Sequence, residues 1–134
     1  MQRGDVFSHK DFTFKDSEHG SKLLVLLYIP RNKAEPYLFC KTTSQKKDKS
    51  TVPGCQPEAS LFFVKKNTNV FREDTWLQLW DIYPITVDSV IQDCMKQYMT
   101  RIDTLSALLI RQILNCIRRS IDVEERYAEV ILKN

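Results

Sequence analysis

All three glycines and all five prolines of this 134-residue chain lie before residue 86. Both residue types interrupt regular helices, because glycine adds backbone freedom and proline removes an N–H donor. Residues 1–85 contain short apolar runs separated by polar loops that hold these breakers, a pattern typical of strands. Residues 86–134 have no breaker and show helical spacing of apolar residues. The sequence therefore predicts one domain, with a β-rich core in residues 1–85 and a helical part in residues 86–134.

Short strands are predicted for residues 5–10, 22–30, 36–42, 60–66 and 74–85. Residues 23–29 form an unbroken apolar run, which predicts a buried central strand that ends at Pro30. Five short strands in so small a segment favour a strongly curved antiparallel sheet or barrel. We therefore expect an α+β fold, in which a small antiparallel β-barrel of about five strands precedes C-terminal helices.

Three helices are predicted, and everything after residue 86 is expected to be helical. The first opens at Thr86 and runs to Met99, and the second opens at Thr104. The third has Asp122 as its N-cap and Glu125 three residues later, which is a capping-box pattern. One face of the second helix is expected to hold Leu105, Leu108, Leu109, Ile113 and Ile117.

The cysteines have wide and unpatterned spacings, with no CxxC or CxxxC pair. A zinc site that also uses His9 and His19 is therefore disfavoured, and no metal is expected. Each cysteine is expected to be a reduced, structural thiol. The four are Cys40, Cys55, Cys94 and Cys116.

Neither a membrane span nor a secretory signal is predicted. The longest apolar run is far shorter than the ~20 residues that cross a bilayer. The first residues, Met-Gln-Arg-Gly-Asp, include no apolar signal core. We expect a cytoplasmic protein.

The formal net charge is only +3, but the positive charge is unevenly distributed. Four lysines lie within nine residues, and only Asp48 opposes them. They are Lys41, Lys46, Lys47 and Lys49. Such a run is either a solvated loop or a contact surface for phosphates. The sequence leaves both interpretations open.

The chain has no GxGxxG, P-loop, HExxH or GxSxG fingerprint. Four short motifs nevertheless occur in a particular order along it. They are Arg3-Gly4-Asp5-Val6-Phe7, Gly20-Ser21-Lys22, Thr42-Thr43-Ser44 and Asp81 at the end of an alternating run. This order and spacing resembles the MazF/PemK family of plasmid-maintenance toxins. The resemblance covers residues 3 to about 85, and the helix from Leu105 also fits it.

The resemblance implies an SH3-like barrel that is dimeric, uses no cofactor and cleaves single-stranded RNA without metal. A cognate antitoxin would cover the RNA groove. In such cleavage the ribose 2′-hydroxyl attacks the adjacent phosphate, so the site needs a proton acceptor, a proton donor and charge stabilisation. The residues implied in these roles are Lys22 as the cation, Thr43 and Ser44 as hydroxyl donors, and Asp81 or His19 to orient or deprotonate the nucleophile. Lys41, Lys46, Lys47 and Lys49 would hold the RNA backbone.

The chain departs from the family pattern at three places. Lys22-Leu23 replaces the usual Arg-Pro, Leu79 stands where some members have arginine, and Ile82 replaces the common glutamine after Asp81. These departures keep a second hypothesis open, namely a catalytically inactive barrel that binds nucleic acid or a protein partner through its helical segment. A structural component of a mobile element is a third hypothesis, which no specific motif supports.

Three further expectations concern assembly, a loop and the tryptophans. The extra apolar helical face favours a homodimer, as does the resemblance. The polar, acidic composition of residues 11–20 predicts a mobile loop that gates the groove. Trp76 and Trp80 lie at strand spacing, which is more often typical of core residues than of a platform for RNA bases.

Overall fold

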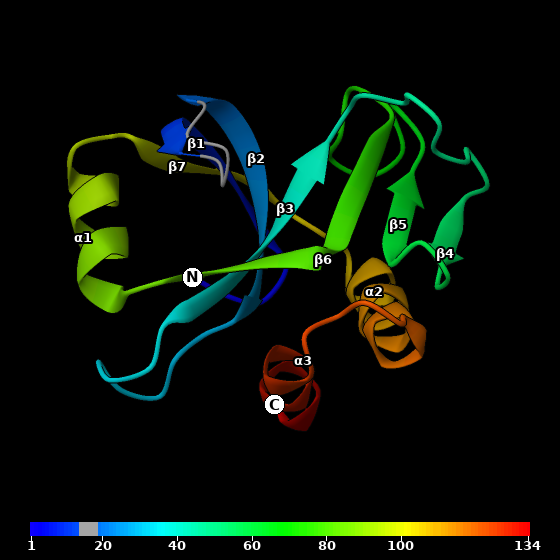
Figure 1. Ribbon diagram of the computed structural model, residues 1–134. Helices are drawn as coiled ribbons and strands as arrows, with labels where there is room; N and C mark the ends of the chain where they lie inside the picture. The colour runs from blue at the N-terminus through cyan, green and yellow to red at the C-terminus, as the bar shows by residue number, and fades with distance from the viewer. Residues whose placement is uncertain (14–18) are drawn as a thin grey trace.

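The computed structural model describes residues 1–13 and 19–134, and for residues 11–13 and 19–21 it describes the backbone only. Within these residues seven strands form one antiparallel sheet accompanied by three helices (Figure 1). The strands are β1 (Asp5–Thr13), β2 (His19–Tyr28), β3 (Tyr37–Thr43), β4 (Gly54–Gln56), β5 (Leu61–Val64), β6 (Thr75–Ile85) and β7 (Met99–Thr104), paired in the order β4-β5-β6-β3-β2-β1-β7. The helices are α1 (Val87–Met95), α2 (Ala107–Arg119) and α3 (Glu125–Lys133). The predicted α+β class is confirmed.

The five predicted strands are all present, as β1, β2, β3, β5 and β6. The expectation that everything after residue 86 is helical is wrong, because β7 follows α1 and pairs with β1. Helix α1 ends at Met95, not Met99, and Gln97 then takes a left-handed conformation with φ of 61°. This turn is made without the glycine that usually marks one, so the sequence did not reveal it.

The carboxylate of Asp5 ties the start of β1 to the end of β7. It accepts hydrogen bonds from the backbone N–H of Gln2 at 2.8 Å and from the hydroxyl of Thr104 at 2.6 Å. Asp5 is itself buried. Asp5 belongs to the motif Arg3-Gly4-Asp5-Val6-Phe7, so part of this motif holds strands together in this chain.

The prediction of a loop at residues 11–20 is wrong for both ends of this segment. β1 and β2 pair as far as Thr13 and His19, so residues 11–13 and 19–20 belong to strands. Phe12 and Thr13 are residue types that favour strands, a signal outweighed in the prediction by the neighbouring polar residues. The rest of the predicted gate, residues 14–18, lies outside the described residues.

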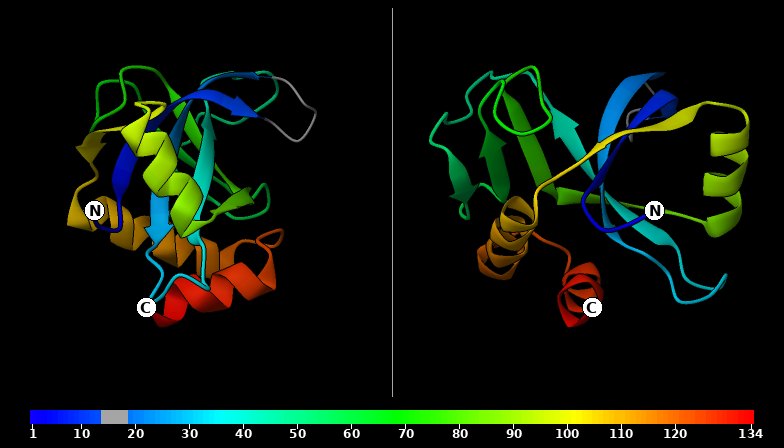
Figure 2. Two further views of the ribbon diagram at one scale, coloured as in Figure 1. Left: turned by 90° about the vertical axis from the view of Figure 1, so that its left-hand side faces the viewer. Right: turned by 180° about the vertical axis from the view of Figure 1, so that it is seen from behind.

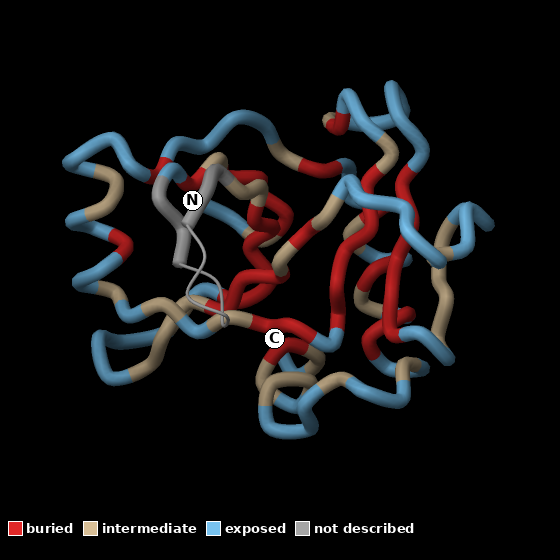
Figure 3. Tube along the Cα trace, turned by 45° about the horizontal axis from the view of Figure 1, so that its top comes forward, coloured by how far each residue is buried: buried red, intermediate tan, exposed pale blue. Residues whose placement is uncertain are grey.

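Strand β2 is buried on both faces, which explains its continuous apolar run. Val25 and Leu27 pack in the main core, which also includes residues of α2 and α3. Leu24 and Leu26 pack on the opposite face, in a smaller core with Val90 of α1. Figure 2 shows α1 at one end of the molecule, away from α2 and α3. Figure 3 shows buried segments of the chain between α1 and the other two helices.

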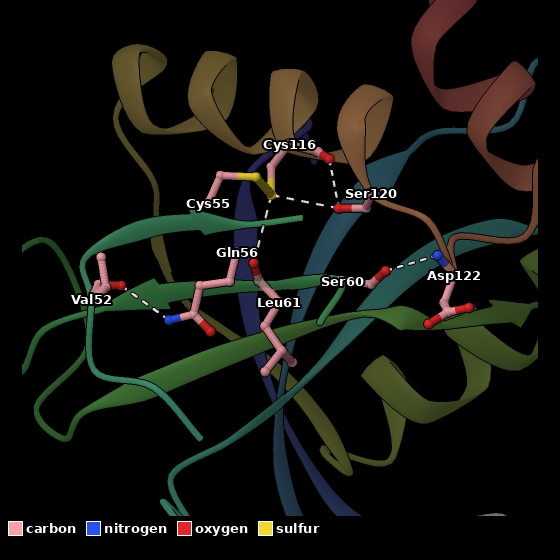
Figure 4. The surroundings of a disulfide bond; sticks show 8 residues. All are labelled: Val52, Cys55, Gln56, Ser60, Leu61, Cys116, Ser120 and Asp122. Carbon is pink, nitrogen blue, oxygen red and sulfur yellow. Dashed lines mark hydrogen bonds between the residues drawn. A yellow bond between two sulfur atoms is a disulfide. The ribbon is translucent and has the colours of Figure 1, made fainter. Parts of the chain in front are cut away.

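The predicted helix starts are correct only for the first helix. Thr86 caps α1 by accepting a hydrogen bond from the N–H of Ser89. Helix α2 is capped by Ser106 rather than starting at Thr104. Glu124 rather than Asp122 occupies the N-cap position of α3, without a side-chain capping hydrogen bond. The N–H of Asp122 instead donates to the hydroxyl of Ser60 at 2.9 Å, outside the helix (Figure 4).

The predicted apolar face of the second helix is also only partly correct. Leu109, Ile113 and Ile117 are buried as expected, but Leu108 is 58% exposed. Adjacent residues of a helix point about 100° apart, so Leu108 cannot share the direction of Leu109. Leu105 is buried, although it precedes the helix.

A disulfide joins Cys55 of β4 to Cys116 of α2, with Cα atoms 5.3 Å apart (Figure 4). The prediction of four reduced thiols is therefore wrong for these two residues. Because β4 was not predicted, the sequence offered no reason to place Cys55 beside the second helix. Cys40 and Cys94 are free thiols, the first buried and the second half-buried.

Candidate functional site

Three of the predicted site residues, Lys22, Thr43 and Ser44, line one cleft of about 530 Å³. Lys22 lies near the start of β2, whereas Thr43 ends β3 and Ser44 follows it. The two strands are antiparallel neighbours, so the start of one lies beside the end of the other. A hydrogen bond of 2.7 Å from the hydroxyl of Thr42 to the carbonyl of Leu23 ties them together there.

Charged residues that the sequence analysis missed complete the cleft. Arg72 and Glu73 reach it from the loop between β5 and β6, and Asp103 reaches it from β7. The triplet Arg72-Glu73-Asp74 before a strand was a visible signal for the first two. Asp103 had no such signal, because its strand was expected to be helix. The cleft thus combines two cations, two carboxylates and the hydroxyls of Thr43 and Ser44.

Lys22 lies in an environment that disfavours its charge. Burial lowers the pKa of its ammonium group, and the charges of Lys41 and Lys49 lower it further, while Asp81 opposes them. Burial and the two neighbouring lysines both disfavour the charged form of Lys22, and an anion placed beside it would favour that form. Lys22 is therefore suited to hold a phosphate.

Asp81 does not line the cleft. It forms an ion pair with Lys41, with 3.0 Å between Oδ2 and Nζ, and its side chain is only 1% exposed. The cause is a bulge in β6: Cys40 pairs with Ile82, but the next residue of β3, Lys41, pairs with Gln78. Between these two pairs β6 has three residues and β3 has none, and this bulge turns Asp81 inward.

The predicted lysine cluster divides into two groups. Lys41 is mostly buried in its ion pair with Asp81, and Lys49 is half-buried and donates to the carbonyl of Gln45 at 3.1 Å. Lys46 and Lys47 are exposed. Only this exposed pair fits the picture of a solvent-facing phosphate contact, so the original alternatives remain open for Lys46 and Lys47.

Of the two histidines, only His9 has a side chain that the structure describes. His19 belongs to β2, where its backbone pairs with Thr13, but its side chain lies outside the described residues. His9 is buried, and its Nε2 lies 3.0 Å from Oδ2 of Asp93. His9 thus links β1 to α1. Among the described side chains, the proton acceptors that line the cleft are the carboxylates of Glu73 and Asp103.

The Arg3-Gly4 part of the first motif packs against the helical part of the chain. Arg3 donates from its guanidinium to the carbonyl of Ile131 near the end of α3, at 3.2 Å. Gly4 has a φ of +92°, and a Cβ at this position would overlap the side chain of Ile110 on α2. Its absent side chain allows this close approach.

The two tryptophans of the chain differ in exposure. Trp76 is 1% exposed, packs against Phe63 with 4.8 Å between ring centroids, and donates from Nε1 to the carbonyl of Ser50 at 2.8 Å. The core interpretation is confirmed for Trp76. It is wrong for Trp80, which is 44% exposed.

Comparisons with known proteins give no family assignment. No family model matches the chain, and no curated protein matches it. Among the residues that the structure describes, no group of three or more histidines, cysteines and carboxylates is arranged to hold a metal ion. In the same ranges, no helix has the length and apolar character needed to span a membrane.

Proposed function

We propose that this protein is an endoribonuclease of the MazF/PemK toxin type, which cleaves single-stranded RNA at the cleft around Lys22. The observation that carries the proposal is the meeting of Lys22, Thr43 and Ser44 in one cleft. These residues come from separate motifs and were selected from the sequence alone. Arg72 adds a second cation to the same cleft. A cluster of cations and hydroxyls is the chemistry that phosphate binding requires.

The reaction begins with a 2′-hydroxyl of the RNA. A carboxylate of Glu73 or Asp103, or the imidazole of His19, takes its proton as the oxygen attacks the adjacent phosphorus. Lys22 and Arg72 stabilise the charge that develops on the phosphate oxygens, and Thr43 and Ser44 donate hydrogen bonds to them. The bond to the 5′-oxygen then breaks, and this oxygen takes up a proton from the group that accepted the 2′-hydroxyl proton.

Arg72 compensates for the replacement of the family's usual arginine by Lys22. The resemblance leads one to expect an arginine where this chain has Lys22, and lysine supplies a point charge rather than a fork of parallel donors. Arg72, from a different segment, supplies a guanidinium to the same cleft. The loss of the bidentate donor at one position is therefore offset at another.

The remaining parts of the proposal follow from the resemblance. They are a cytoplasmic homodimer, a cognate antitoxin that covers the cleft, and closure of the curved sheet as an SH3-like barrel. The Cys55–Cys116 disulfide is unusual for a reducing compartment. The redox state of these two residues in cells is therefore a direct check on the cytoplasmic location.

The second hypothesis, a catalytically inactive binding module, is supported by the position of Asp81. This carboxylate is buried in an ion pair and does not line the cleft. If no other group takes the proton from the 2′-hydroxyl, the cleft binds RNA without cutting it. Cleavage and binding must therefore be measured separately.

The deciding experiment incubates purified protein with mixed-sequence single-stranded RNA in EDTA. We expect cleavage by the native chain, and a loss of roughly 10²–10³-fold in rate for Lys22→Ala, the scale for loss of one electrostatic donor. Lys22→Arg should retain activity, because arginine preserves the charge. The control is Lys133→Ala, an exposed lysine at the end of α3, which should leave the rate unchanged.

Two outcomes would count against this proposal. RNA binding without cleavage by the native chain would leave the inactive binding module. Cleavage at an undiminished rate by Lys22→Ala would mean that the cleft is not the catalytic centre.

A further inference from the structure

A second hollow, of about 700 Å³, lies beside Trp80. Its other walls come from residues 48–50 and Val52, from Gln56 of β4, from residues 57–59 and from Leu61 of β5. Trp80 belongs to the bulged part of β6, where Asp81 is turned inward and the indole of Trp80 is left exposed. We propose that this hollow binds one base of the single-stranded RNA, stacked on the Trp80 indole. The inference rests on the proposed function and specifies how the RNA is gripped.

The walls of this hollow are held in place before any ligand binds. The carbonyl of Ser50 accepts hydrogen bonds from Nε1 of Trp76 at 2.8 Å and from Nε2 of Gln56 at 2.9 Å. Gln56 also donates to the carbonyl of Val52 at 3.0 Å (Figure 4). The neighbouring Cys55 anchors β4 to α2 through the disulfide. A preformed site loses little conformational freedom when a ligand binds.

The side chains of this hollow suit a base rather than a phosphate. Asp48 and Glu58 lie along it together with Lys49, so two carboxylates face one cation there, whereas in the cleft two carboxylates are matched by Lys22 and Arg72. Carboxylate oxygens accept hydrogen bonds from the exocyclic amino groups of adenine, cytosine and guanine. The indole offers a stacking face to any base. We therefore expect a base with an amino group to bind better than uracil.

The hollow and the cleft are linked by one short loop. Ser44 lines the cleft, and the loop that follows it supplies residues 48–50 and Val52 to the hollow. Lys49 lines the hollow, yet its charge also acts on Lys22 in the cleft. An RNA strand that follows this loop would place a phosphate at Lys22 and a nearby base on Trp80.

The test measures binding, not cleavage, so that it does not depend on turnover. The probe is a fluorescently labelled, mixed-sequence single-stranded RNA with 2′-O-methyl groups, which removes the nucleophile. Trp80→Ala should weaken its binding by roughly 10- to 100-fold, the scale of one lost base–aromatic stack. Trp80→Phe keeps an aromatic face and should stay within about 3-fold of the native affinity. The matched control is Tyr98→Ala, since Tyr98 is 43% exposed but lies outside both cavities.

A second probe separates stacking from a general structural effect. It has the same length and phosphates but only abasic sugars. Native protein and Trp80→Ala should bind it equally, because no base remains to stack. If Trp80→Ala lost affinity for the abasic probe as well, the base site would be overturned.

Two further results would also be decisive. If Trp80→Ala bound the first probe like the native chain while Lys22→Ala bound it weakly, the base site would be refuted and the phosphate cleft would stand. If the native chain bound neither probe, both the base site and the proposed function would be refuted.

Discussion

Lys22 is the residue whose surroundings most directly affect the proposed chemistry. Burial lowers its pKa, and nearby lysines add to the effect. A lysine with a lowered folded-state pKa loses its proton in the folded chain before it does in the unfolded chain. The unfolded chain then binds more protons between the two values, so this group makes folding more favourable as pH rises through that window. The same rise in pH removes the charge that would hold a phosphate.

Loss of the Lys22 charge predicts that the rate of RNA cleavage falls on the alkaline side of the pH profile. RNA cleavage by the native chain should decline at a pH below 10.5, the ordinary value for lysine. In Lys22→Arg the decline should move to higher pH, because a guanidinium keeps its proton throughout this range. Initial rates are measured from neutral pH to about pH 10, with uncatalysed RNA hydrolysis subtracted. A limb at the same pH in both proteins would assign the titration to another group.

At the scale of elements, the approach of α2 to the start of β1 depends on Gly4. Gly4→Ala should lower the free energy of unfolding by roughly 2–4 kcal/mol, because it combines left-handed strain with overpacking against Ile110. Gly54→Ala is the matched control. Gly54 has nearly the same φ, +88°, but nothing lies within 4 Å of an added Cβ. It should lose only the strain, roughly 1–2 kcal/mol. Urea denaturation of both variants checks this, and equal losses would rule out the packing role of Ile110.

The elements also show which parts of the fold were readable from the sequence. Strand β2 was readable because both of its faces are buried, so its apolar run is continuous. Strand β7 was not, since Met99 is its only buried residue and no glycine marks the turn before it. The missed strand also limited the prediction of the candidate site. Lys22 and Thr43 could be brought together from strand ends alone, whereas Asp103 depends on β7 and Arg72 on the path of a loop.

At the scale of the whole molecule, the disulfide is the covalent tie between the sheet and the helical part. Cys55 and Cys116 are 61 positions apart in the sequence. Closing a loop of that length restricts the unfolded chain, and the chain-entropy model gives a stabilisation of roughly 4 kcal/mol.

Reduction of the disulfide, or the pair of changes Cys55→Ser and Cys116→Ser, should therefore lower the midpoint of urea denaturation. Cys94→Ser is the control and should leave the midpoint nearly unchanged, because Cys94 is a half-buried free thiol. A native protein with four titratable thiols after denaturation without reductant would show that the bond is absent.

The position of β7 has a consequence for how the chain is made. β1 has β2 on one side and β7 on the other, and Asp5 pairs with Thr104 near the far end of the sequence. During synthesis β1 and β2 leave the ribosome long before residues 99–104. Until these residues arrive, the outer edge of β1 presents unpaired N–H and C=O groups to other chains. Completion of the sheet must therefore wait for a distant contact, which makes it slow and leaves the nascent protein open to self-association in the interval.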